Sequence, residues 1–278
     1  MISSMGKFDG VAILTDLDGT FLNRRGKVVE RNVKALEYFK SEGGLFSLST
    51  GRMHYGLGKL VQGVDKLVNA PAVLCNGTYL YDFGASRVLS EIVMDGELAY
   101  EAVTFMRKNF PSTSVRISFR GGFLMDESDV KAISQIVDFG IDEKSIEPFA
   151  TWSKDGWYKI ACRENAEVVP RLRAAIEAEF PNCFEFNCSG AELLEIQMKG
   201  VNKASMIEPF RAHYRKAGRE LKIYACGDFE NDYSILCAAD VAVCPQNAMQ
   251  RIKDISDLCL CSNDEGLIAD LIEYLERG

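Results

Sequence analysis

The sequence has no long apolar run, only two histidines and no excess of positive charge. Spanning a bilayer takes about 20 consecutive apolar residues, and no stretch approaches that length, so we expect no membrane insertion. Residues 1–10 lack a basic segment followed by an apolar one, which argues against a secretory signal. We therefore expect a cytoplasmic protein.

The charge balance limits the kinds of partner. The net charge is −8, whereas a broad nucleic-acid footprint needs clustered Lys and Arg. A small local group of positive charges can still hold a phosphate, so an anionic small molecule remains compatible. We expect a small phosphorylated metabolite as partner, no nucleic acid, and no obligate protein partner.

The nine cysteines do not form a recognisable metal or disulfide pattern. No CxxC pair occurs, and His54 and His213 stand near no cysteine, which argues against a structural zinc site. Apolar, strand-like contexts surround four of them: Cys75, Cys162, Cys226 and Cys244. We expect these to be reduced residues of a core.

The two ends of the chain alternate between apolar strands and helices. Near the start, strands are predicted at 11–15, 45–49 and 72–75, with a helix at 30–42 that ends at Gly43. After residue 198 the alternation returns. Strands are predicted there at 222–226, 241–243 and 258–261, and helices at 202–216, 232–238, 248–253 and 265–277. This order is typical of a parallel sheet with helical crossovers.

The middle of the chain has a different pattern. Short strands are predicted at 88–93, 115–119, 122–125, 157–162, 183–188 and 193–198, with helices at 97–109, 130–139 and 167–180. A tight turn at Arg120–Gly122 favours antiparallel pairing with helices on one face. We therefore predict an α/β, Rossmann-like core domain from residues 1–82 and 196–278, with an α+β domain, 83–195, inserted in it.

Polar clusters follow several strands of the predicted core. Asp16 and Asp18 come after the first strand and Thr50 after the second, and Asp228 follows the strand at 222–226. Ligands of an open parallel sheet bind at the carboxyl ends of its strands, so these groups should converge. Carboxylates that converge repel one another unless a cation is present, and Mg²⁺ prefers carboxylate ligands. Lys203, near a helix start, supplies a second positive charge.

This set of residues fits phosphoryl transfer. With an ordinary pKa of about 3.9, Asp16 is expected to be ionised at neutral pH and to attack phosphorus directly. Mg²⁺, Lys203, the Thr50 hydroxyl and backbone N–H groups would cancel the phosphate charge. Asp18 would protonate the leaving oxygen and then activate water. Gly19 permits the tight loop that this geometry needs.

Four motifs, in order, resemble those of the haloacid dehalogenase-like phosphatases. They are DLDGT (16–20), STGR (49–52), GVNK (200–203) and GDFEND (227–232). The likeness is closest to the Cof-type hydrolases, which carry a large α+β cap between the second and third motifs. CNGTYLYD (75–82) and DVAVCPQNA (240–248) also resemble stretches of that family, although Cys244-Pro245 departs from its usual residues.

The resemblance implies a role for each matching residue. Asp16 maps to the nucleophile and Asp18 to the general acid/base. Thr50 and Lys203 map to the groups that bind the transferring phosphate. Asp228 maps to the metal-holding acid, with Asp16 and the backbone carbonyl of Asp18 as further Mg²⁺ ligands.

The remaining candidates carry alternatives. Asp232 either supports the metal, directly or through water, or orients Lys203. We expect Gly51, Arg52, Asn76 and Asn231 to contact the substrate. Arg52 has the alternative of pairing with an acid at the surface, and Asn231 that of capping the following helix.

The leading prediction is a Mg²⁺-dependent phosphoric monoester hydrolase acting on a sugar phosphate or a phosphorylated cofactor. One alternative is a phosphomutase, which returns the phosphoryl group to another hydroxyl of a sugar. The other is a phosphosugar-binding protein without catalysis. The intact acids and lysine argue against the second alternative.

Overall fold

The computed structural model describes residues 6–188 and 190–277, and the chain divides into two compact units. The first unit takes in the chain as far as Glu91 and again from Asn202, and the second comprises Ile92–Val201. The predicted insertion, 83–195, begins and ends earlier than the observed second unit. At the first boundary the reason is strand pairing, because β5 (Arg87–Glu91) pairs with β4 (Tyr79–Asp82) of the first unit.

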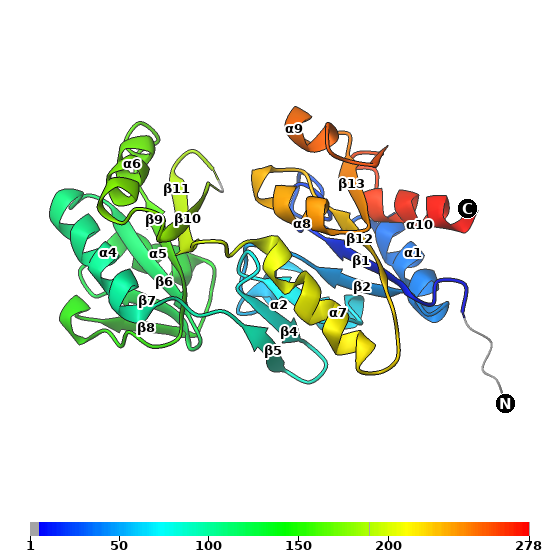
Figure 1. Ribbon diagram of the computed structural model, residues 1–278, viewed down its shortest axis with the longest axis horizontal. Helices are drawn as coiled ribbons and strands as arrows, with labels where there is room; N and C mark the ends of the chain where they lie inside the picture. Colours follow the sequence, from blue (N-terminus) through cyan, green and yellow to red (C-terminus); the bar gives the residue numbers. More distant parts are fainter. Residues whose placement is uncertain (1–5, 189, 278) are drawn as a thin grey trace. The chain divides into compact units, whose positions relative to one another are not determined.

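A five-stranded sheet forms the centre of the first unit (Figure 1). Its strands, in spatial order, are β14 (Leu258–Leu260), β13 (Val241–Pro245), β12 (Lys222–Cys226), β1 (Val11–Thr15) and β2 (Leu45–Leu48). Every neighbouring pair is parallel. Strands β1, β2 and β12 are almost continuously buried, as expected for a sheet covered on both faces. The predicted parallel α/β fold is confirmed.

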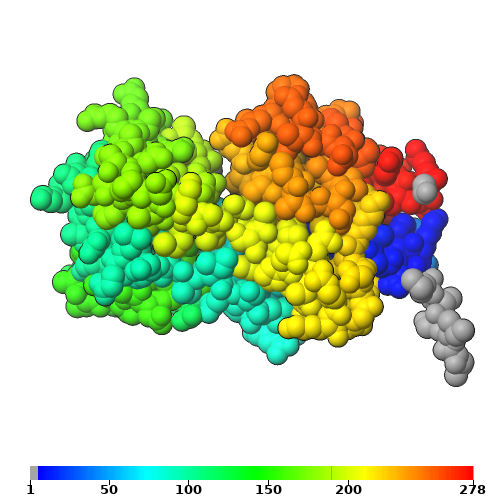
Figure 2. All heavy atoms as spheres, viewed as in Figure 1, coloured from blue at the N-terminus to red at the C-terminus, as the bar shows by residue number. Residues whose placement is uncertain are grey.

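Helices cover both faces of this sheet. The chain passes from β1 to β2 through α1 (Glu30–Ser41), and in the opposite direction from β12 to β13 through α8 (Tyr233–Ala238). Because such crossovers are right-handed, these two helices lie on opposite faces. The last helix, α10 (Leu267–Arg277), packs against α1, and Figure 2 shows its red atoms beside the blue ones.

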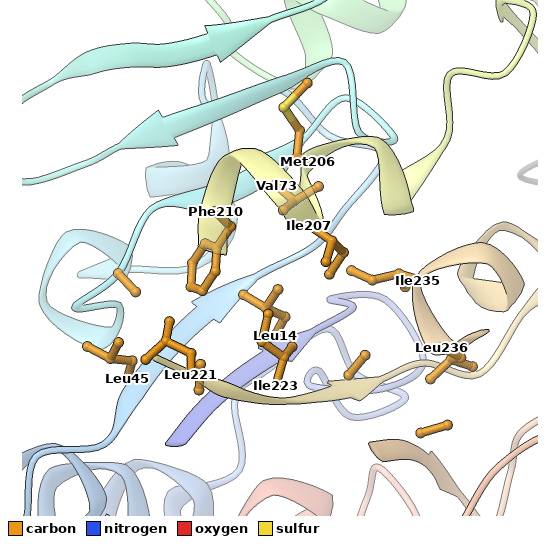
Figure 3. Packing of buried hydrophobic residues seen from close by; sticks show 14 of the residues in the cluster. Leu14, Leu45, Val73, Met206, Ile207, Phe210, Leu221, Ile223, Ile235 and Leu236 are labelled. Atoms are coloured by element: carbon orange, nitrogen blue, oxygen red, sulfur yellow. The ribbon is translucent and has the colours of Figure 1, made fainter. Parts of the chain in front are cut away.

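An apolar core lies between the sheet and α7 (Ile207–Arg215), α8 and α9 (Gln250–Lys253) (Figure 3). Leu14 of β1, Ile223 of β12 and Phe210 of α7 are all buried in it. This packing holds β1 and β12 in register, with Thr15 opposite Cys226 at their carboxyl ends. The core therefore positions the two loops that carry most of the acidic residues.

Smaller elements complete the first unit. β3 (Ala72–Leu74), β4 and β5 form an antiparallel sheet, and a bridge between Ser49 and Val73 joins it to the end of β2. Two short helices, α2 (Leu57–Leu60) and α3 (Val64–Leu67), precede β3. The sequence analysis did not predict β4, because it treated 75–82 only as part of a family-like stretch.

The second unit contains a six-stranded sheet covered by helices. The strand order is β10 (Phe184–Cys188), β11 (Leu193–Met198), β9 (Trp157–Arg163), β6 (Ser114–Phe119), β7 (Gly122–Asp126) and β8 (Lys144–Glu147). The helices are α4 (Gly96–Asn109), α5 (Val130–Asp138) and α6 (Val169–Glu179), with a 3₁₀ turn at Phe149–Thr151.

The antiparallel pairing predicted for this unit holds for four of its strand pairs. The exception is β8, which runs parallel to β7 because α5 crosses over between them. The sequence analysis did not predict β8, whose four residues, KSIE, have only one apolar side chain.

Two findings concern membrane-spanning helices and the cysteines. None of the helices in the described ranges is long and apolar enough to cross a membrane. All nine cysteines are free thiols, and four are buried as predicted: Cys75, Cys162, Cys226 and Cys244.

Candidate functional site

The first acidic pair lies at the carboxyl end of β1. Asp16 is only 6% exposed, and its N–H donates to the carbonyl oxygen of Cys226 at 2.8 Å. The side chain of Asp18 is 55% exposed. At Gly19, φ is +84° and a Cβ atom would lie 2.4 Å from Oδ2 of Asp228. Glycine is therefore needed for this loop to pass so close to Asp228.

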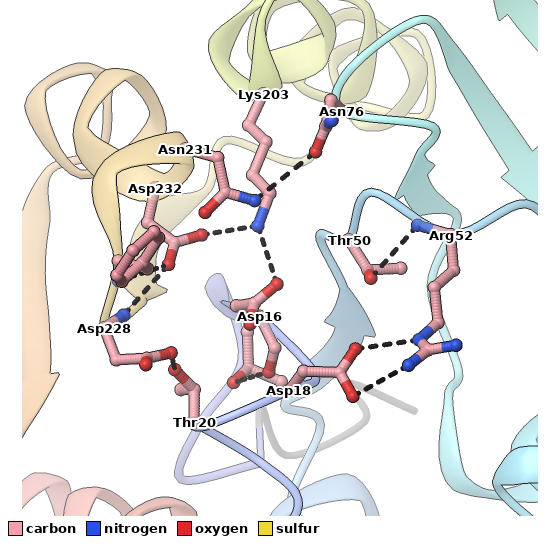
Figure 4. Close-up of polar contacts among 12 residues, drawn as sticks. Asp16, Asp18, Thr20, Thr50, Arg52, Asn76, Lys203, Asp228, Asn231 and Asp232 are labelled. Atoms are coloured by element: carbon pink, nitrogen blue, oxygen red, sulfur yellow. Dashed lines mark hydrogen bonds and ion pairs between the residues drawn. The ribbon is translucent and has the colours of Figure 1, made fainter. Parts of the chain in front are cut away.

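Lys203 reaches the cluster from the start of a 3₁₀ turn, Lys203–Met206, which the Asn202 side chain caps. The lysine is completely buried. Its Nζ donates to Oδ1 of Asp16 at 2.6 Å and to Oδ1 of Asp232 at 2.5 Å (Figure 4). One ammonium group thus joins the loop after β1 to the loop after β12.

Asp232 uses both of its carboxylate oxygens within the protein. Oδ1 accepts from Lys203, and Oδ2 accepts from the N–H groups of Asp228 and Phe229 at 2.9 and 3.0 Å. The residue ends a 3₁₀ turn, Glu230–Asp232, and is completely buried. These contacts fit the predicted role of orienting Lys203, since a direct bond to a metal would compete with them.

Asp228 completes the acidic cluster. Its Oδ1 accepts a hydrogen bond from Oγ1 of Thr20 at 2.6 Å. Carboxylate oxygens of Asp16, Asp228 and Asp232 lie within 4.8 Å of one another. Such a group of oxygen donors is suited to a hard divalent cation.

Burial changes the ionisation of these acids. Removal from water raises the pKa of Asp16 to about 8, although the charge of Lys203 opposes this, and raises the pKa of Asp228 to about 6. Burial also lowers the pKa of Lys203, but Asp16 and Asp232 outweigh it, so the net shift is upward and the lysine stays charged. Burial therefore opposes the ionisation that was expected of Asp16 at neutral pH without help, because it disfavours the charged form of the carboxyl group.

The loops after β2 and β3 form the other side of the site. The N–H of Thr50 donates to the carbonyl oxygen of Val73 at 2.9 Å, and that of Asn76 donates to the carbonyl oxygen of Thr50 at 3.0 Å. Oδ1 of Asn76 accepts from Nδ2 of Asn231 at 3.4 Å, and a Cβ at Gly51 would lie 2.7 Å from the same oxygen. Asn231 is not a helix cap, because it lies inside the 3₁₀ turn Glu230–Asp232 and the residue before α8 is Asp232.

Arg52 makes a two-point contact with Asp18. Its Nε donates to Oδ2 at 2.7 Å and its Nη2 donates to Oδ1 at 3.0 Å. Arg52 therefore pairs with an acid, as one of its two alternatives predicted, but the partner is an acid of the site. All ten predicted site residues belong to the first unit and lie around these loops: Asp16, Asp18, Thr50, Gly51, Arg52, Asn76, Lys203, Asp228, Asn231 and Asp232. All of them except Gly51 are labelled in Figure 4.

Comparison with known proteins agrees with this geometry. A family model described as haloacid dehalogenase-like hydrolase matches residues 13–272. The chain belongs to the haloacid dehalogenase-like hydrolases. It is 26% identical to the 5-amino-6-(5-phospho-D-ribitylamino)uracil phosphatase YwtE of Bacillus subtilis, over 96% of this chain and 98% of that protein. Phosphatase YwpJ of the same organism is 25% identical, over 95% and 99% respectively. The predicted class, a phosphatase of this family, is confirmed.

Solved structures of haloacid dehalogenase-like hydrolases share the fold. One from Bacteroides thetaiotaomicron has a TM-score of 0.80 at 20% identity, covering 95% of this chain and 99% of that chain. The HAD subclass IIB sugar phosphatase BT4131 has a TM-score of 0.79 at 18% identity, covering 96% and 99%. At these identities the likeness concerns the fold alone.

Two residues that the sequence analysis did not select support this haloacid dehalogenase-like site. Thr20 holds Asp228, and Nδ2 of Asn247 donates to the carbonyl oxygen of Gly19 at 2.8 Å. Thr20 is the last residue of DLDGT, and Asn247 lies in DVAVCPQNA, so each stood inside a motif already noted. Their positions in those motifs were the available signal.

Proposed function

We propose that this haloacid dehalogenase-like phosphatase is Mg²⁺-dependent and hydrolyses the phosphate ester of a small metabolite through an aspartyl-phosphate on Asp16. The observation that carries the proposal is the buried Lys203, whose Nζ contacts both Asp16 and Asp232 beside the carboxylate of Asp228. Burying a lysine between acids costs desolvation free energy, and a buried cation of this kind suits a site that binds a doubly negative phosphate group.

The donor set fits Mg²⁺. Asp16 and Asp228 offer carboxylate oxygens from adjacent strands, and burial raises the pKa of both in the absence of a second cation. Asp16, Asp228 and the backbone carbonyl of Asp18 would hold the ion, with Asp232 acting on it only through water. When bound, Mg²⁺ would neutralise negative charge on the transferring phosphoryl group and on Asp16.

The side chains of the chain itself perform the remaining steps. A carboxylate oxygen of Asp16 forms a bond to phosphorus while the ester oxygen leaves with its bonding electrons. Asp18 gives that oxygen a proton and then takes one from the water that hydrolyses the aspartyl-phosphate. Lys203 and the hydroxyl of Thr50 bind phosphoryl oxygens, whose charge spreads in the transition state.

The names of the relatives support a proposal for the substrate class. Two that span most of this chain are named 5-amino-6-(5-phospho-D-ribitylamino)uracil phosphatases, and that name describes a phosphorylated ribityl group joined through an amino nitrogen to a uracil ring. A third, matched over 28% of this chain, is a pyridoxal phosphate phosphatase. We propose a substrate of the same kind, a sugar phosphate or a phosphorylated cofactor or cofactor precursor.

The test is a screen of such esters with Mg²⁺, scored by release of inorganic phosphate. Asp16→Asn should lose at least about a thousandfold in kcat while keeping the circular dichroism of the parent. Asp65→Asn is the matched control, because Asp65 is an exposed aspartate of α3 and lies outside the site.

Three outcomes would contradict the proposal. The first is unchanged turnover by the Asp16→Asn variant, which would remove Asp16 as nucleophile. The second is an isomerised sugar phosphate in place of free phosphate, which would identify a phosphomutase. The third is tight binding of esters without turnover, which would favour a binding protein.

A further inference from the structure

The contact between Arg52 and Asp18 has a specific geometry. Two nitrogens of the guanidinium group meet the two oxygens of one carboxylate, at 2.7 and 3.0 Å. This fork arrangement fixes the plane of the carboxylate as well as its position, which a single contact does not do. Figure 4 shows the Asp18 side chain directed toward Arg52.

The backbone of Arg52 is anchored on both sides. Its N–H donates to Oγ1 of Thr50 at 3.3 Å, and its carbonyl oxygen accepts the N–H of Cys75 at 2.9 Å. Asp18 follows β1 and Arg52 follows β2, which are neighbouring parallel strands. The two residues therefore project from fixed loops at the same edge of the sheet.

Stability does not explain this ion pair. The side chains of Arg52 and Asp18 are 41% and 55% exposed, and ion pairs at such positions contribute little to folding. Lys203 already supplies a buried cation to Asp16. Arg52 instead contacts the one acid of the site that must meet the leaving group, and a general acid works only when held within reach of its target atom.

We propose that Arg52 is a positioning residue that holds the carboxylate of Asp18 within reach of the leaving oxygen. In general acid catalysis one oxygen of Asp18 stays on the guanidinium group, while the other leaves it, takes up a proton from solvent and passes that proton to the leaving oxygen. This inference rests on the proposed function, in which Asp18 protonates the leaving oxygen. It assigns the arginine to the leaving-group side of the reaction and separates its role from direct binding of the transferring phosphoryl group.

Leaving-group dependence tests the assignment. An aryl phosphate such as para-nitrophenyl phosphate needs little protonation of its leaving oxygen, whereas an alkyl phosphate needs it fully. For Arg52→Gln and Arg52→Lys we expect kcat to fall at least about tenfold on the best alkyl phosphate of the screen. On para-nitrophenyl phosphate the fall should stay within about threefold, which also shows that the variants are folded.

A double variant tests whether Arg52 affects catalysis through Asp18. If Arg52 acts through Asp18, Arg52→Gln should add little to the loss caused by Asp18→Asn on the alkyl phosphate. Independent roles would make the two losses multiply. Arg31→Gln is the matched control, because Arg31 also pairs with a carboxylate, that of Glu273, but lies on α1 outside the site.

Three results would overturn the inference. The first is an equal loss of kcat on both esters with a raised KM, which would place Arg52 on the phosphoryl group. The second is a double variant in which the two losses of kcat multiply. The third is faster turnover of the alkyl phosphate by Arg52→Gln. Failure of the proposed function is distinguishable, because the parent protein would then release no phosphate from either ester.

Discussion

Nζ of Lys203 lies 2.6 Å from Oδ1 of Asp16, although 187 positions separate the two residues in the chain. The lysine is fully buried, and a second carboxylate, that of Asp232, contacts the same Nζ. This arrangement joins the loop after β1 to the loop after β12. It also leaves each partner dependent on the other for a compensating charge.

Replacing Lys203 by Met should destabilise the metal-free protein. Asp232 loses the cation of its buried ion pair, and Asp16 loses a hydrogen-bond donor. Breaking a buried ion pair from one side costs about 3–5 kcal/mol. Urea unfolding measures the change, and added Mg²⁺ should recover part of it. Lys34→Met is the control, since Lys34 forms an exposed pair with Glu30 and should have little effect. Equal losses in the two variants would contradict the assignment.

Gly19→Ala should weaken Mg²⁺ binding because the new Cβ would lie 2.4 Å from Oδ2 of Asp228. We expect the Mg²⁺ concentration for half-maximal activity to rise at least about tenfold. Gly26→Ala is a close control: Gly26 also has a positive φ, +67°, but nothing lies within 4 Å of its Cβ position. Gly26→Ala therefore introduces backbone strain without a steric clash. If the two variants had a similar Mg²⁺ dependence, the clash with Asp228 would not be the cause.

Thr20→Val should affect the metal through Asp228. The hydrogen bond from Thr20 holds down the pKa of Asp228, which burial otherwise raises. Without it, protons compete better for the carboxylate, and we expect about a tenfold loss of apparent Mg²⁺ affinity near pH 6. The loss should shrink at pH 8, and Thr20→Ser, which keeps the hydroxyl, should restore affinity. Calorimetric titration with MgCl₂ at both pH values measures this.

Mg²⁺ affinity should rise with pH until about pH 8. Asp16, with its pKa raised to about 8, and Asp228, with its pKa raised to about 6, must both release protons before they bind the ion. The apparent affinity should therefore fall steeply below pH 6, where two protons compete, and more gradually between pH 6 and 8. Affinity that does not change from pH 5 to pH 8 would contradict these shifts.

The same shifts set the stability of the metal-free protein. Between about pH 4, where free Asp ionises, and these raised values, the folded state binds more protons than the unfolded chain. Stability should consequently fall as pH rises through this interval. Saturating Mg²⁺ should oppose this loss of stability most strongly at the high-pH end of the interval. Unfolding the protein at several pH values, with and without the ion, measures the pH dependence and the effect of Mg²⁺.

Local patterns in the sequence predicted a large part of this molecule. The buried runs at 11–15 and 222–226 became the adjacent strands β1 and β12, because a continuous apolar segment needs cover on both faces. The motifs also carried the chemistry, since DLDGT and GDFEND each place their acids within a few residues of a strand end. Both features are contiguous in the chain, and contiguous patterns are what a sequence displays directly.

Tertiary structure decided which groups meet and in what environment. It brought Arg52 to Asp18 across 34 positions, gave both oxygens of Asp232 to other partners, and buried Asp16 deeply enough to raise its pKa. Pairing and desolvation depend on atoms from distant segments that become neighbours only on folding. The candidate reactive residues could therefore be proposed from the sequence, whereas their charge states and their contacts arise from the packing of β1, β2 and β12 side by side.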